Sequence, residues 1–199
     1  MRRTWPVTAV TLVLLVVHGS ASAAERRPWV TLTDCRYMAA KDNDGDSFRV
    51  RCGSRDFHLR LYFVDAPETN LRYAERTREQ SEHFGVTLDE TMKAGARARD
   101  TVQGMLREPF VVRTRWATAG GRGREPRYYA LVEVGGRSLV EVLVSRGLAR
   151  PKGVSLALPT GEKARAYVER LEALERDARQ KRLGIWATST DATTDSPTR

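Results

Sequence analysis

The sequence has few of the residues that build thiol chemistry or soft-metal sites. It contains two cysteines and three histidines in 199 residues. The cysteines do not form a CxxC pair, and the histidines are scattered at positions 18, 58 and 83. Structural zinc sites need four such ligands, mostly in closely spaced pairs. This scarcity argues against a cysteine-based metal centre and leaves oxygen atoms as the ligands of any metal.

Long apolar runs are also missing, apart from one near the start. Residues 7–17, VTAVTLVLLVV, follow a basic start and precede a small-residue triplet that ends at Ala23. These three features are typical of an export signal, and the run is too short to span a bilayer. We expect cleavage after Ala23, a secreted or periplasmic protein, and no membrane anchor in the mature chain.

Acidic residues are outnumbered by basic ones, 25 to 34, which gives a formal net charge of +9. A basic surface suits a polyanionic partner, because contacts with phosphate groups release counterions and so drive association. The same charge can serve solubility alone. Charge by itself therefore favours a nucleic-acid partner without requiring one.

Apolar alternation predicts strands, and apolar residues at helical spacing behind capping boxes predict helices. The predicted strands cover residues 29–42, 47–52, 57–65, 110–116 and 128–134. The predicted helices cover residues 87–106, 138–149 and 162–186, and the polar stretch 72–85 admits a short surface helix. The predicted order of regions is a leader at 1–23, a polar lead-in at 24–29, one domain at 30–187 and a disordered tail at 188–199.

This order of elements predicts an α+β protein built on a five-stranded β-barrel of the OB type with three packed helices. A single-layer sheet with helices on one face is the structural alternative. Export would place Cys35 and Cys52 in an oxidising compartment, where two cysteines allow one intramolecular bond. Because the two residues fall on neighbouring predicted strands, we expect a Cys35–Cys52 disulfide.

Three aspartates alternate in the stretch KDNDGDSFRV, residues 41–50: Asp42, Asp44 and Asp46. The Asp44–Gly45 pair is a strong hairpin-turn signal, but it does not explain why Asp46 follows. The spacing approaches that of an EF-hand loop, which needs Gly at its sixth position and Glu at its twelfth. Ser47 and Gly53 stand at those positions, so the sequence argues against an EF-hand.

A second group of acids follows the third predicted strand, where the motif VDAPE contains Asp65 and Glu68. Strand ends in a small barrel lie close together, so these acids can converge with Asp44 and Asp46. Carboxylates gather at low cost only where a positive charge joins them, and without Cys or His the fitting ion is Ca²⁺ or Mg²⁺. Taken singly, each acid is more often a solvated turn residue.

Two arginines accompany these acids: Arg60 on the strand that leads to Asp65, and Arg127 at the start of the fifth strand. A metal ion with paired guanidinium groups suits phosphodiester hydrolysis, because the transition state gains negative charge. Plain surface charge is the alternative for either arginine alone.

The sequence resembles the staphylococcal nuclease (thermonuclease) family over residues 30–187. The motifs are DGDSF, RLYFVDAPET, RYYALVEVGGRSLVEVLVSRGLA and the final LGIW. The resemblance implies an OB-fold barrel and a Ca²⁺-dependent endonuclease acting on DNA and RNA. It implies metal ligation by Asp46, Asp65 and the backbone carbonyl of Ala66. It also implies water activation by Glu68 and phosphate binding by Arg60 and Arg127.

Asp44 and Ser47 match family residues that contact the metal ligands but not the metal itself. The segment between Glu68 and the capping box at Thr87 is longer than in short family members. The region ARPKGVSLALP lacks the tyrosines that stack on a terminal nucleotide, and the loop before Arg127 offers two rival phosphate ligands, Arg122 and Arg124.

Three hypotheses of function follow. The first is a secreted or periplasmic, monomeric Ca²⁺-dependent phosphodiesterase that cleaves DNA and RNA with little sugar specificity. The second is a non-catalytic OB domain that binds nucleic acid in the same basic groove. The third is an exported domain that calcium only stabilises.

Overall fold

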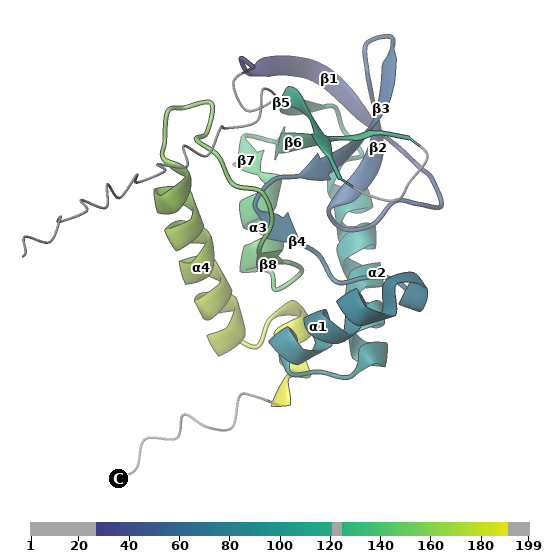
Figure 1. Cartoon of the computed structure of the whole chain (residues 1–199), viewed down its shortest axis with the longest axis vertical. Coiled ribbons are helices and arrows are strands. Elements are labelled where there is room, and N and C mark those ends of the chain that lie inside the picture. The colour runs from purple at the N-terminus through teal and green to yellow at the C-terminus, as the bar shows by residue number, and fades with distance from the viewer. Residues whose placement is uncertain (1–26, 121–124, 191–199) are drawn as a thin grey trace, which may run out of the picture.

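The computed structural model describes residues 27–120 and 125–190 (Figure 1). The predicted leader, Arg122, Arg124 and the tail after Thr190 lie outside these residues. Within the described ranges, no helix combines the length and the apolarity needed to cross a membrane.

The strands and helices follow one another in the order shown in Figure 1. The strands are β1 Val30–Met38, β2 Ser47–Cys52, β3 Arg55–Leu61, β4 Val64–Asp65, β5 Phe110–Ala119, β6 Arg127–Val134, β7 Arg137–Ser138 and β8 Arg150–Pro151. The α-helices are α1 Ala74–Phe84, α2 Leu88–Met105, α3 Leu139–Ser145 and α4 Ala164–Gln180. Two 3₁₀ helices, η1 Leu71–Tyr73 and η2 Gly184–Ala187, complete the described chain.

The main sheet closes on itself. Its strand order is β3-β2-β1-β5-β6-β7, and an additional pairing joins β3 to β6. That closing pair is parallel, with His58 opposite Arg127, whereas the other neighbours are antiparallel. The predicted α+β fold with a five-stranded OB-type barrel, made of β1, β2, β3, β5 and β6, is confirmed.

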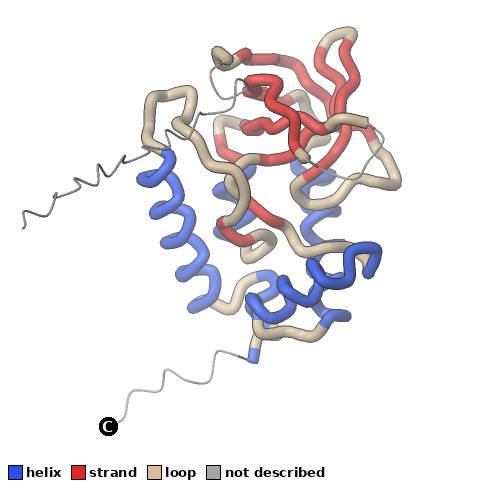
Figure 2. The backbone as a smooth tube through the Cα atoms, in the orientation of Figure 1, coloured by secondary structure: helices blue, strands red, loops and turns tan. Residues whose placement is uncertain are grey.

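The barrel interior and parts of α2, α3 and α4 form the main hydrophobic core, and a smaller cluster around Phe84 and Trp186 joins α1, α2, α4 and η2. The alternating residues Phe48 and Val50 of β2 and Leu59 and Leu61 of β3 are buried. Helices α2, α3 and α4 add their apolar faces to the main core. Figure 2 shows the strands of the main sheet gathered at one end of the molecule, and the helices below and beside them. Removing such residues from water supplies most of the folding free energy.

The third strand ends earlier than the sequence predicts, and this difference shapes the site. Phe63 is buried in a left-handed backbone conformation with φ of 68°, which costs energy for a residue that is not glycine. The chain turns there, and β4 leaves the barrel to pair with β8, which sets Asp65 directly opposite Arg150.

Two further differences concern the helices and the tail. The stretch predicted at most as a short surface helix forms the 11-residue helix α1, which packs beside α2. The first residues of the predicted tail are placed against the domain, because the backbone amide of Thr190 donates a hydrogen bond to the carbonyl of Gly85 at 2.9 Å; the rest of the predicted tail lies outside the described residues.

The two cysteines form a disulfide between neighbouring strands. Cys35 of β1 and Cys52 of β2 are bonded, with their Cα atoms 4.2 Å apart and a sequence separation of 17 residues. Both residues are buried in the core. The bond fixes β1 against β2. Strand β2 begins directly after the acidic turn, which contains Asp42, Asp44 and Asp46.

Replacing both cysteines by alanine should lower the free energy of unfolding by about 3 kcal/mol, the chain-entropy value for a loop of this length. Urea unfolding followed by circular dichroism measures this change, and reduction of the wild-type protein should produce a similar loss. Two thiols that react in the denatured, unreduced protein would contradict the bond.

Candidate active site

The two acid-bearing segments meet at one end of the barrel. The backbone amide of Ala66 donates a hydrogen bond to Asp46 Oδ2 at 2.7 Å, which joins the turn before β2 to the loop after β4. Glycines allow this approach. A Cβ on Gly45 would lie 2.8 Å from the Cβ atoms of both Ala66 and Ala98, and one on Gly95 would lie 2.4 Å from the carbonyl oxygen of Pro67.

Arg60 lies between the two aspartates. Its Nη1 donates to Asp46 Oδ1, and its Nη2 lies 3.2 Å from Asp65 Oδ1. The Arg60 side chain is only 12% exposed, so one buried guanidinium bridges two buried carboxylates. Burial opposes its charge, but Asp46, Asp44 and Asp65 hold the pKa of Arg60 above its ordinary value.

Asp65 has the largest set of donors in this cluster. Oδ1 accepts from Arg60 and from Arg76 Nη2, while Oδ2 accepts from Arg150 at 2.8 and 3.0 Å and from Gln80 Nε2 at 3.0 Å. Burial alone would raise the pKa of Asp65, but Arg76, Gln80, Arg60 and Arg150 together lower it to about 2. Asp65 is therefore ionised across the physiological pH range.

Asp46 has a different environment. Burial raises its pKa well above the ordinary value, Arg60 opposes the rise, and the nearby carboxylates of Asp44 and Asp65 add to it. Asp44 itself shapes the turn, because its Oδ1 accepts from the backbone amides of Asp46 at 3.0 Å and Ser47 at 2.7 Å. Asp44 thus fixes the direction of Asp46 from behind, as the family resemblance implies.

Glu68 follows Asp65 in the loop after β4 and lies at the edge of the cluster. Burial raises the pKa of Glu68, Arg76 lowers it, and Asp46 and Asp65 raise it further. Its Oε1 lies 2.8 Å from Arg76 Nε, and its side chain is 15% exposed. A partly buried carboxylate with a raised pKa is suited to accept a proton from water.

Arg127 reaches the same end of the barrel from the first position of β6. Its Nη1 donates to Ser47 Oγ at 3.3 Å, and its Nη2 donates to the carbonyl of Gly120 at 2.7 Å. Ser47 is the residue after Asp46, so Arg127 lies beside the acidic turn. Asp46, Asp65, Ala66 and Arg60 are thus linked by direct hydrogen bonds, Asp44 and Ser47 belong to the same turn, Glu68 joins through Arg76, and Arg127 joins only through Ser47.

Four residues of this cluster are absent from the sequence prediction: Arg76, Glu79, Gln80 and Arg150. Three come from α1, whose polar composition indicates only a solvated helix. Gln80 is fully buried. It donates to Asp65 and to the carbonyl of Ala66, and it accepts from the amide of Glu68 at 2.8 Å. One side chain therefore holds the whole loop from Asp65 to Glu68.

Arg150 is the fourth, and it is 2% exposed. Its guanidinium contacts Asp65 and also Glu79 of α1. The sequence feature that could have indicated these residues is the i, i+4 spacing of Arg76 and Gln80, which puts both on one face of the helix. Nothing in the sequence says that this face points inward.

The donor set fits a hard cation in its chemistry. The candidate ligands are Asp46, Asp65 and the carbonyl of Ala66, all oxygen atoms, as Ca²⁺ prefers. The unfavourable ionisation of buried Asp46 is a cost that a divalent cation would relieve. No preformed group of three or more His, Cys, Asp or Glu side chains that could hold a metal occurs in the described residues. Arg60 and Arg76 contact the acids instead.

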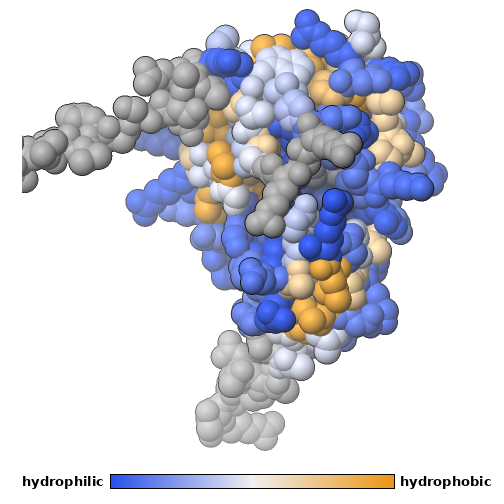
Figure 3. All heavy atoms as spheres, turned by 45° about the vertical axis from the view of Figure 1, so that its right-hand side comes forward, coloured by the Kyte–Doolittle hydropathy of each residue, from blue (hydrophilic) through white to orange (hydrophobic). Residues whose placement is uncertain are grey.

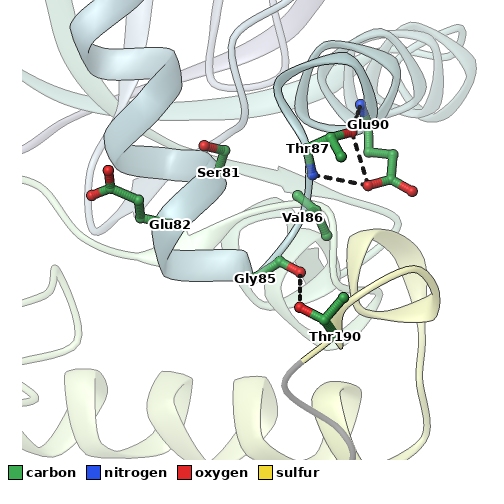
Figure 4. Close-up of a pocket in the computed structure, with 7 residues that line it drawn as sticks. All are labelled: Ser81, Glu82, Gly85, Val86, Thr87, Glu90 and Thr190. Carbon is green, nitrogen blue, oxygen red and sulfur yellow. Dashed lines mark hydrogen bonds between the residues drawn. The ribbon is translucent and has the colours of Figure 1, made fainter.

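A separate pocket of about 370 Å³ lies between the end of α1 and the start of α2 (Figure 4). Figure 4 shows the Thr87–Glu90 capping box and the Thr190–Gly85 hydrogen bond at its wall. None of the candidate site residues lines this pocket. It is a space between the end of α1, the start of α2 and Thr190, and it is not part of the site.

The site therefore consists of carboxylates and arginines gathered at one end of a closed barrel. The model of the staphylococcal nuclease homologue family matches residues 58–188, and the chain belongs to this family. Family members are generally nucleases and typically depend on Ca²⁺. The matched segment includes Arg60, Asp65, Glu68 and Arg127, whereas Asp46 precedes it. A search of curated proteins finds no match.

Replacing Arg150 by methionine keeps most of the side-chain volume and removes the cation that faces Asp65 and Glu79. The free energy of unfolding at pH 7 should fall by about 3 kcal/mol, because a buried carboxylate loses one partner. Urea unfolding measures this change. The matched control is Lys152→Met, because Lys152 binds the same Glu79 but is 51% exposed; its effect should stay within about 0.5 kcal/mol.

The pH dependence has a definite sign. The pKa of Asp65 in the folded protein, about 2, lies below the unfolded value of 3.8. Its ionisation therefore stabilises the fold above about pH 4, and this contribution disappears as the pH falls toward 2. The difference in the free energy of unfolding between wild type and Arg150→Met should therefore become smaller as the pH falls from about 4 toward 2. Equal stabilities at pH 7 would contradict the role of Arg150.

Proposed function

We propose that this protein is a Ca²⁺-dependent endonuclease that hydrolyses phosphodiester bonds of DNA and RNA with little sugar specificity. The observation that carries the proposal is the convergence of Asp46, Asp65, Glu68, Arg60 and Arg127 at one end of the barrel. The family match supports nuclease-type chemistry. The basic composition supports a polyanionic substrate. Figure 3 shows one face on which hydrophilic residues surround smaller hydrophobic patches.

In the proposed reaction, Glu68 accepts a proton from the water molecule whose oxygen attacks phosphorus. The bond between phosphorus and the 5′-oxygen breaks, the 5′-oxygen takes up a proton, and the product carries a 3′-phosphate. Arg60 and Arg127 donate hydrogen bonds to the phosphate oxygens and stabilise the charge that develops there. Ca²⁺, held by Asp46, Asp65 and the Ala66 carbonyl, would supply further positive charge to a phosphate oxygen.

The cellular setting is also a proposal. The leader-like sequence of residues 1–23 and the disulfide between the two cysteines support a secreted or periplasmic enzyme. With a nucleic-acid substrate and no partner needed to complete the site, we propose a monomer.

Cleavage of plasmid DNA should require Ca²⁺ and stop when a chelator is added. Glu68→Gln should lower kcat by about 10²- to 10⁴-fold, because it removes the proton acceptor and keeps the side-chain shape. The matched control, Glu172→Gln on the exposed face of α4, should leave kcat unchanged. Salt-sensitive DNA binding without cleavage by the wild-type protein would support the non-catalytic OB domain instead.

Arg127→Lys should lower kcat by about 10²-fold or more while the fold stays intact, because lysine cannot offer two parallel donors to one phosphate. Arg127 is held by Ser47 and Gly120 at the mouth of a barrel strand. Arg122→Lys and Arg124→Lys are the comparison variants, and they should mainly weaken substrate binding in a salt-dependent way. A large kcat loss in Arg124→Lys, with little in Arg127→Lys, would reverse the assignment.

A further inference from the structure

His58 is a buried imidazole beside the site that the proposed reaction does not use. It lies on β3, and its side chain is 8% exposed. The sheet register places Arg49 of β2 on one side of it and Arg127 of β6 on the other. A histidine between two arginines needs a reason, because protonation would put a third positive charge at this position.

The hydrogen bonds around His58 are compatible with a neutral ring that accepts a proton from Ser47. Arg127 Nη1 donates to Ser47 Oγ at 3.3 Å, and Ser47 Oγ lies 3.1 Å from His58 Nε2. A guanidinium can only donate, so the Ser47 hydroxyl accepts from Arg127 and has its own proton free to donate to Nε2. In the arrangement in which Ser47 donates to Nε2, the proton of neutral His58 sits on Nδ1, which faces Asp42 Oδ2 at 3.8 Å.

The charges around His58 link the two loops that border the site. Arg49 contacts Asp42 at 3.2 Å and Glu125 at 2.7 Å, so it joins the turn before β2 to the segment just before Arg127.

Burial lowers the pKa of His58, Asp42 raises it, Arg49 and Arg127 lower it, and the backbone of Ser47 raises it. The net direction keeps the imidazole neutral at pH 7.

We propose that neutral His58 is a positioning residue for Arg127. By accepting the Ser47 proton it turns the lone pairs of Ser47 Oγ toward Arg127, and this fixes the guanidinium in the direction needed to bind phosphate. Protonated His58 becomes a donor at Nε2. Ser47 can then no longer donate to His58, so its hydroxyl must reorient, and the added positive charge repels Arg127; the hold on Arg127 therefore weakens as the pH falls.

Only the consequence for catalysis rests on the proposed function; the coupling of His58 to Arg127 does not. Phosphate binding should weaken as the pH falls through the pKa of His58, which lies below its ordinary value of 6.5. His58→Gln retains an acceptor for the Ser47 proton and does not titrate. His58→Lys is a permanent cation without an acceptor.

The first experiment measures binding of a short labelled single-stranded oligonucleotide with chelator present, so that no cleavage occurs. Wild type should bind about tenfold more weakly at pH 5 than at pH 7.5, beyond the change seen in His58→Gln. His58→Lys should bind weakly at both pH values. The control His83→Lys, at a partly exposed position on α1, should behave as wild type. Parallel pH profiles for wild type and His58→Gln would overturn the proposal.

The second experiment separates this inference from the nuclease proposal. The His58 ring is titrated by NMR in wild type and in Arg127→Gln, with His83 as the internal reference. Removing Arg127 should raise the pKa of His58; an unchanged His58 pKa would overturn the coupling. If wild type cleaves no nucleic acid but both experiments succeed, the nuclease proposal fails and His58 keeps its role in a binding protein.

Discussion

The ionised carboxylate of Asp65 is the interaction on which the site depends. Its two oxygens collect donors from three other elements: Arg60 of β3, Arg76 and Gln80 of α1, and Arg150 of β8. Removing a carboxylate from water is costly, and close cations with good hydrogen bonds are what offset the cost. Without Asp65, the buried guanidinium of Arg150 and the amide of Gln80 would each lose one of their partners.

Asp46 and Asp65 lie on either side of one guanidinium, yet their environments shift their pKa values in opposite directions. Asp65 faces three arginines and stays ionised, whereas Asp46 faces Arg60 alone and two other carboxylates. Asp65 is therefore already compensated by the protein, and Asp46 is the acid that gains most from an added cation. Such an asymmetry couples any bound cation to the turn formed by Asp44 and Gly45.

The barrel could be predicted from the sequence, and so could the candidate acids and arginines, because both depend on local patterns. Alternation fixes which residues of β2 and β3 face inward, and the turn at Asp44 and the motif after β3 deliver the acids to neighbouring strand ends. The disulfide follows from the same strand order. These features need only short stretches of chain, which a single sequence displays directly.

The role of α1 could not be predicted in this way. Its polar face looks like a solvent-exposed face, and only the position of Asp65 turns that face inward. That position depends in turn on Phe63, whose left-handed backbone diverts β4 toward β8. Arg150 is 85 residues from Asp65 in the chain, and no local pattern links two residues so far apart. The missed residues are therefore those whose surroundings are set by long-range packing.

Preorganisation connects these observations. A donor stabilises a developing charge best when its direction is fixed before the reaction, because no free energy is then needed to order it. Arg60 is held by two aspartates, and Arg127 by a serine hydroxyl and a backbone carbonyl. Arg49 joins the two bordering loops on the outer side. The arginine-rich composition therefore does more than make the surface basic, because several arginines hold the acids and the loops of the site in place.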